Sequence, residues 1–261
     1  MADISRRSMI KTAGSIGLTI LPIGLAPQAA SAQTTGMSTS PPMTGMPGQS
    51  EVSPEQLAST YLFLNHDEAS FVEAACARLI PADENWPGAL EAGAPNYIDK
   101  QLGGAWGAGE RLYRSGPWGQ GTPSQGYQLP FTPAELFRAA LTAIIKELNE
   151  KHLTFANMSP SEQDAYLEGL EAGGRDLGGV PSDVFFTHLW ECTLEGFFSD
   201  PVYGGNRNMV SWRMIGFPGA YASYYDLVDQ HGIKIDRAPM SLGEDAYGRM
   251  HMDPGIHARM P

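Results

Sequence analysis

The sequence predicts a mainly α-helical protein, an irregular helical bundle with long loops rich in Gly, Pro and aromatic residues and an extended C-terminal tail. Several segments repeat apolar residues at intervals of three and four, which is the period of an amphipathic helix. No window alternates apolar and polar residues as a half-buried strand does. Gly and Pro contribute 30 and 20 of the 261 residues, so we expect long, turn-rich connections between the helices.

Residues 1–32 have the pattern of a twin-arginine signal peptide. Arg6 and Arg7 stand in the run SRRSMIK, and a weakly apolar stretch then leads to the small residues Ala-Ser-Ala, so we expect cleavage between Ala32 and Gln33. A membrane anchor is the alternative, but the apolar stretch is interrupted by Gly and Pro and is too short to span a bilayer comfortably. The leader implies the twin-arginine translocase as a partner, folding before export, and a periplasmic location.

Residues 33–53 are rich in Thr, Ser, Gly, Pro and Met and have no hydrophobic period, which is typical of a flexible linker. Their methionines, Met37, Met43 and Met46, are the alternative ligands of a soft copper(I) site. A helical domain is expected over residues 54–231.

Apolar periodicity and capping residues predict the helices of this domain in order. The first begins at Asn65 and is stopped by Pro81, and the second carries a continuous apolar stripe over 132–148. The third begins with Ser-Pro-x-Glu and covers 159–173, where two glycines end it. A Phe-rich helix follows over 182–197, and a shorter helix is expected over about 220–230.

Two segments between the helices, 103–130 and 200–219, combine large aromatic residues with many glycines and prolines. Such segments suit a rigid surface that packs against another protein, because aromatic side chains bury area at little entropic cost. The alternative is that they are loops that cover the chain's own helices.

The second of these segments is the predicted subunit interface. Asp-Pro ends the Phe-rich helix, and the following Gly-Gly-Asn permits a tight turn with positive φ. The hydrophobic residues after the turn are too close together to share one helical face, so we expect some to project outward. The alternative for Trp212 and Phe217 is an internal role in the core. The predicted interface residues are Tyr203, Gly204, Gly205, Asn206, Trp212, Arg213, Met214 and Phe217.

Residues 232–261 contain several charges and only scattered apolar residues, too few to build a core. We expect this tail to extend across a partner's surface. The alternative is a metal site in the tail, although its candidate ligands have no fixed coordination geometry. These residues are Met250, His251, Met252, Asp253 and His257.

The net charge of −12 disfavours electrostatic binding to nucleic-acid phosphates or anionic lipid headgroups. We therefore expect no nucleic-acid partner, and contact with a membrane only through another protein. The two cysteines, Cys76 and Cys192, provide no haem-attachment motif and no four-thiolate metal site. They can form a disulfide that closes a long loop, or remain two independent buried thiols.

Motifs of catalysis and cofactor binding are missing from the sequence. Residues 107–112 begin like a dinucleotide fingerprint, but Leu112 stands at the third glycine position and no strand precedes it. His188 and Glu191 lie three residues apart on a helix and are more often a structural pair than a catalytic one. No metal site and no catalytic residue are assigned on this basis.

Four segments carry a resemblance to a known family. They are EAACARLIPADE (73–84), PGALEAGAPNYIDKQLGG (87–104), TPAELFRAAL (132–141) and TLEGFFSDPVYGGNRNMVSWRMIGFPGAY (193–221). The chain resembles the small subunit of bacterial gluconate 2-dehydrogenase, the subunit 3 family, and the last segment is the most specific.

The resemblance implies a heterotrimer on the periplasmic face of the cytoplasmic membrane. A flavoprotein of the glucose-methanol-choline oxidoreductase type would carry FAD and oxidise a sugar acid or related sugar. A multihaem cytochrome c subunit would carry the haem c groups and pass electrons to ubiquinone. The small subunit itself would hold no cofactor.

Two hypotheses about function arise from these patterns. In the first, the chain is a non-catalytic accessory subunit whose leader exports the flavoprotein by association and whose aromatic surfaces hold it folded. In the second, it is itself an exported enzyme with an acid-base site formed by His188, Glu191, Asp200 and Arg213.

Overall fold

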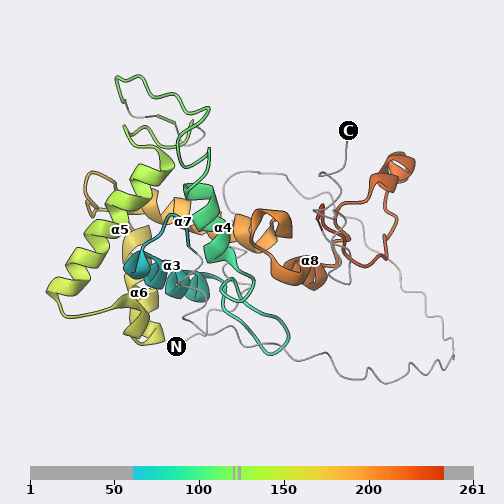
Figure 1. Cartoon of the computed structure of the whole chain (residues 1–261), viewed down its shortest axis with the longest axis horizontal. Helices are drawn as coiled ribbons and strands as arrows, with labels where there is room; N and C mark the ends of the chain where they lie inside the picture. The colour runs from blue at the N-terminus through green and yellow to red at the C-terminus, as the bar shows by residue number, and fades with distance from the viewer. Residues whose placement is uncertain (1–60, 120, 123–124, 244–261) are drawn as a thin grey trace, which may run out of the picture. The chain divides into compact units, whose positions relative to one another are not determined.

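The computed structural model describes residues 61–119, 121–122 and 125–243. Within these ranges the chain is helical and has no β-strand, which confirms the predicted fold class (Figure 1). No helix in this described part is long and apolar enough to cross a membrane. The signal peptide predicted at 1–32 and the linker predicted at 33–53 lie outside the described residues.

The α-helices are α3 (His66–Leu79), α4 (Ala94–Leu102), α5 (Pro133–Glu150), α6 (Pro160–Glu171), α7 (Ser182–Phe198) and α8 (Val210–Ile215). Short 3₁₀ helices are η2 (Phe155–Asn157), η3 (Pro201–Tyr203), η4 (Arg207–Met209) and η5 (Ala222–Leu227).

The four amphipathic helices predicted from periodicity are present as α3, α5, α6 and α7. The helix predicted at 220–230 is instead the shorter 3₁₀ helix η5, because no residue of that segment is buried and it lacks an apolar face to hold it. Helices α4 and α8 were not predicted.

Capping boxes start three of the predicted helices. At α3, the Asn65 side chain accepts a hydrogen bond from the Glu68 N–H, and the Glu68 carboxylate accepts one from the Asn65 N–H. The same reciprocal bonding occurs at the start of α5 and of α6. Each box satisfies two backbone donors that a helix start otherwise leaves without partners.

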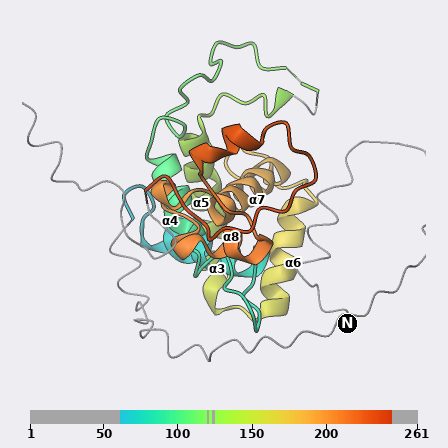
Figure 2. The ribbon, with the colours of Figure 1, turned by 90° about the vertical axis from the view of Figure 1, so that its right-hand side faces the viewer.

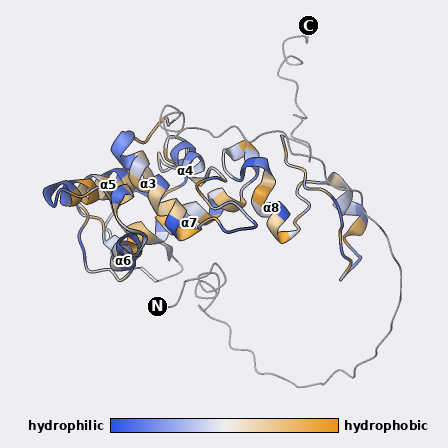
Figure 3. Cartoon of the chain, turned by 90° about the horizontal axis from the view of Figure 1, so that it is seen from below, coloured by the Kyte–Doolittle hydropathy of each residue, from blue (hydrophilic) through white to orange (hydrophobic). Residues whose placement is uncertain are grey.

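Helix α7 is the central element of the bundle, and α3, α4, α5 and α6 all pack against it. Buried Phe side chains fill the space between the helices. The ring of Phe185 on α7 lies 5.4 Å from that of Phe137 on α5 and 6.5 Å from that of Phe71 on α3. The helices carry hydrophobic residues beside hydrophilic ones, as amphipathic helices do (Figure 3).

A glycine permits the close packing of α4 on α7. A Cβ atom at Gly196 would lie 3.0 Å from the Cβ of Tyr97 and 3.1 Å from the Cα of Ala94, so a side chain at this position would push the helices apart. Helix α4 begins after Gly93, whose φ of 81° provides no side-chain cap. The start signals of this short helix are therefore weak: a proline, Pro95, stands in its first turn, but no side chain caps it.

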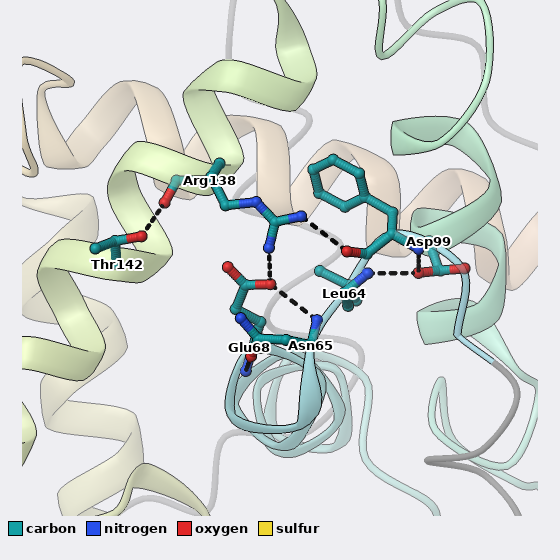
Figure 4. A network of polar contacts seen from close by, with 7 residues as sticks. Leu64, Asn65, Glu68, Asp99, Arg138 and Thr142 are labelled. Atoms are coloured by element: carbon teal, nitrogen blue, oxygen red, sulfur yellow. Dashed lines mark hydrogen bonds and ion pairs between the residues drawn. The ribbon is translucent and has the colours of Figure 1, made fainter.

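Two buried carboxylates fix the chain segment that enters the bundle (Figure 4). Asp99 of α4 accepts hydrogen bonds from the N–H groups of residues 62, 63 and 64, each at 2.8 Å. Glu68, whose side chain is 2% exposed, forms an ion pair with Arg138 of α5. Arg138 also donates to the Phe63 carbonyl and lies over the Phe63 ring. The network thus joins the entering segment to α3, α4 and α5.

We expect Arg138→Leu to lower the free energy of unfolding by about 2 to 3 kcal/mol, because it leaves the Glu68 carboxylate buried without its guanidinium partner. Urea unfolding followed by circular dichroism measures the change. The matched control is Arg114→Leu, which removes a pair with Glu135 in which both side chains are about half exposed; it should cost less than about 1 kcal/mol.

The double variant Glu68→Gln/Arg138→Leu should be more stable than Arg138→Leu alone, because it removes the buried charge together with its partner. A double variant as unstable as the sum of the two single variants would contradict this account.

Candidate interaction surface

The predicted interface begins at a turn that the Asp200 side chain organises. One carboxylate oxygen of Asp200 accepts the Val202 N–H at 3.0 Å, and the other accepts the Leu242 N–H at 2.8 Å. Gly204 ends the 3₁₀ helix η3 with a φ of 100°, as the sequence predicted for this turn. Asp200 therefore joins the end of α7 to a segment some forty residues later in the chain, which the sequence did not indicate.

Asn206 holds the turn to α7 and α8. Its side chain is buried and donates to the Ser199 carbonyl at 2.9 Å. The side-chain oxygen accepts the Ser211 N–H at 2.9 Å and the Ser211 hydroxyl at 2.8 Å. All the polar atoms of this amide are therefore engaged within the chain, and Asn206 supports the predicted interface without forming its surface.

Three residues of the turn that are not glycine have left-handed backbone conformations. The φ values are 44° at Asn206, 57° at Asn208 and 53° at Met209. Each conformation costs on the order of 1 kcal/mol, less for Asn than for Met. The hydrogen bonds of Asn206 and the burial of Met209 offset this strain.

Trp212 is an internal anchor of this region. Its side chain is 6% exposed, and its ring N–H donates to the Phe198 carbonyl at the end of α7 at 2.9 Å. Phe217 packs edge-on against the Trp212 ring at 5.1 Å but is itself 44% exposed. Trp212 therefore has the internal role that the sequence analysis gave as an alternative. Phe217 is exposed at the surface, as are Tyr203 and Arg213. Met214 is half-buried.

Part of the predicted tail returns to this region. The Met240 N–H donates to the Pro218 carbonyl, and the Met240 carbonyl accepts the Ala220 N–H at 2.7 Å. The Tyr221 hydroxyl donates to the Ala238 carbonyl at 2.9 Å. Residues 238–242 thus lie against the chain's own 200–221 segment, while the tail residues proposed as metal ligands lie outside the described residues.

We call the segment 200–243 the arm. It carries most of the large hydrophobic side chains that are exposed in the described part of the chain: Val202, Tyr203, Ile215, Phe217, Tyr225, Val228, Ile233 and Leu242. Helix α8 and the residues after it lie at the end of the bundle away from α5, and Figure 2 shows them from that end. Exposed apolar side chains concentrated in one segment of a chain are typical of protein-binding surfaces.

The residues of the alternative acid-base site do not form one cluster, because His188 and Asp200 lie far apart. The His188 ring nitrogen Nδ1 is 2.9 Å from the Val184 carbonyl, and the ring packs edge-on against Tyr127. Phe198, at the end of α7, is about 15 Å along the helix axis from His188, and Asp200 lies beyond it. Glu191 and Arg213 are exposed. Among the described residues, no three His, Cys, Asp or Glu side chains gather as metal ligands would.

The two cysteines are buried free thiols. Cys76 Sγ lies 3.5 Å from the Thr193 hydroxyl. Burial raises the pKa of Cys76 to about 12 and also raises the pKa of Cys192. Both thiols therefore remain protonated at neutral pH. The sequence left open a disulfide or two independent thiols, and in the structure the two cysteines are independent thiols.

Comparison with protein families gives a match that includes the helical bundle and the first part of the arm. The family model described as gluconate 2-dehydrogenase subunit 3 matches residues 66–219, from the start of α3 to the end of the segment predicted as the interface. This range is well over half of the chain. No match was found among curated proteins or among solved structures.

We expect Gly205→Ala to lower the free energy of unfolding by about 3 kcal/mol, because a Cβ atom there would lie 2.0 Å from the Gly196 carbonyl oxygen and backbone would have to move. The control is Gly169→Ala on α6, where no atom lies within 4 Å of the new Cβ. That substitution should be neutral or stabilise by up to about 1 kcal/mol. Equal melting temperatures for the two variants would argue against the close contact.

Proposed function

The chain belongs to the gluconate 2-dehydrogenase subunit 3 family, and from this premise we propose that it is the non-catalytic small subunit of an exported dehydrogenase that binds and stabilises the flavoprotein subunit. Family membership makes the chain a subunit of an oxidoreductase complex and implies partner subunits. Which partners it binds, and how, belongs to the proposal.

The observation that supports the proposal best is the exposed apolar surface of the arm. Ile215 and Tyr225 are 57% and 89% exposed, and other exposed hydrophobic residues lie close to them in the chain. The arm is held in place by hydrogen bonds of Asn206, Trp212 and Asp200, so these side chains are presented on an ordered backbone. A preorganised apolar surface loses little entropy when a partner covers it.

The proposed partner on this surface is an FAD-containing large subunit of the glucose-methanol-choline type. In the same complex, a multihaem cytochrome c subunit would transfer the electrons to ubiquinone and hold the assembly at the periplasmic face of the membrane. FAD and haem c would thus lie in partner subunits. The role of this chain would be to keep the flavoprotein folded and in place.

The proposed route to the periplasm is the signal peptide of this chain. Because the twin-arginine translocase carries folded proteins, one leader at 1–32 is sufficient to export a flavoprotein that has already bound FAD and this subunit. Binding through the arm would precede export.

We expect Ile215→Lys to weaken association with the flavoprotein at least about tenfold, because a charge would be buried in an apolar interface. Position 215 lies at the C-terminal end of α8, where a positive charge stabilises the helix. The substitution should therefore leave the melting temperature of the isolated chain unchanged. Co-purification and a titration of the two subunits measure the effect.

The matched control is Leu153→Lys, an equally drastic change at a residue that is 43% exposed in the connection after α5. It should leave association unchanged. If Ile215→Lys binds the flavoprotein as tightly as this control, the arm is not the interface.

The export proposal predicts that replacing Arg6 and Arg7 together with Lys leaves both this chain and the flavoprotein in the cytoplasm. Cell fractionation followed by immunoblotting and a dye-reduction assay measures where each subunit accumulates. Active flavoprotein in the periplasm of this variant would show that it has its own export route.

A further inference from the structure

A polar cleft lies between α4 and the turn at the start of the arm. Its volume is about 380 Å³. Asp99 and Lys100 of α4 line one side, and Gly204, Gly205, Arg207 and Asn208 of the turn line the other. None of the exposed apolar side chains of the arm lines this cleft, and its lining residues are mainly polar or charged.

Two cations dominate the charge of the cleft. Within the described ranges, neither Lys100 nor Arg207 has a carboxylate oxygen within 4 Å, although the chain carries a net charge of −12. Arg207 is positioned by a hydrogen bond of 2.7 Å from its guanidinium to the Asn96 side-chain oxygen. Asp99 also lines the cleft, but it is 2% exposed and both of its oxygens accept N–H bonds. The net charge of the cleft is therefore about +1, which suits a monoanion.

Two glycines make room for these cations. A Cβ atom at Gly93 would lie 2.7 Å from Arg207 Nε, and one at Gly204 would lie 2.8 Å from Lys100 Nζ. Both glycines have positive φ values, 81° and 100°, which other residues rarely adopt. Arg207 thus packs directly on the backbone of Gly93, and Lys100 on that of Gly204. A larger residue at either glycine would displace the charged side chain.

The backbone of the turn adds a hydrogen-bond donor. Gly205 lines the cleft, and its N–H has no backbone hydrogen-bond partner within the described part of the chain. Asn206 and Asn208 have left-handed conformations, which turn successive peptide groups in a way that is common in anion-binding loops. The strain at these residues is of the kind that recurs at binding sites.

We propose that this cleft binds a carboxylate group. Arg207 presents the planar guanidinium that pairs with a carboxylate, Lys100 supplies a second positive charge, and the N–H of Gly205 is a further donor. The carboxylate can come from a small free acid or from an acidic side chain of the partner subunit. Both sources use the same contacts, and the second rests on the proposed function.

The first test uses the isolated full-length chain and acetate as the probe. Titration at constant ionic strength, with chloride as the balancing anion, should shift the amide NMR signals of Gly205 and Asn208 in a saturable manner. Lys100→Gln should weaken acetate binding at least about fivefold. Lys146→Gln, which removes an exposed lysine of α5, is the matched control and should bind as the unchanged chain does.

The second test measures association with the flavoprotein for the same variants. If the partner supplies the carboxylate, Lys100→Gln should weaken association at least about fivefold while Lys146→Gln does not, and acetate should no longer shift the two signals in the complex. If the cleft takes a free acid, acetate should bind the complex as it binds the isolated chain.

The proposal is overturned if acetate gives no saturable shift and the two lysine variants associate equally well with the flavoprotein. It is also overturned if acetate binds but Lys100→Gln binds it as tightly as Lys146→Gln. If the unchanged chain does not bind the flavoprotein at all, the proposed function fails, and the acetate titration alone decides whether the cleft is a carboxylate site.

Discussion

The contact at Gly196 of α7 is the constraint on which the functional end of the molecule depends, because two helices and a turn meet there. At their present distance, α4 and α7 leave no room for a side chain at position 196. The Gly196 carbonyl also accepts the N–H of Asn206 at 2.9 Å, which places the turn beside α4. The two walls of the cleft and the base of the arm are therefore set by the same residue.

An exposed apolar surface is useful for binding only if its side chains do not collapse onto their own core. In this chain the buried partners of the arm prevent the collapse. Asn206 and Trp212 attach the turn and α8 to the end of α7, and Asp200 holds the returning segment at Leu242. The remaining apolar residues, such as Ile215, have no place in the core and stay on the surface.

Charged residues divide into two groups with different roles. Arg138, Arg78 and Arg175 form ion pairs with acidic residues of other helices and so hold the bundle together. Lys100 and Arg207 have no such carboxylate in the described part of the chain and face a cleft instead. In a chain this acidic, two cations that have no ion-pair partner among the described residues are available to an external anion.

The sequence by itself determined the helical class and four of the helices, because periodic apolar residues and capping boxes such as Asn65 with Glu68 are local signals. It also determined the turn at Gly204, since a positive φ there favours glycine. Only the tertiary structure decided that Trp212 is buried and Ile215 exposed. Both are large hydrophobic residues in the same short helix, and their burial depends on which other segments pack against each side chain. Contacts between distant segments, for which no local pattern exists, decide three further features. These are the position of helix α4, the hydrogen bonds between Met240 and Pro218, and the location of Lys100 and Arg207 in one cleft.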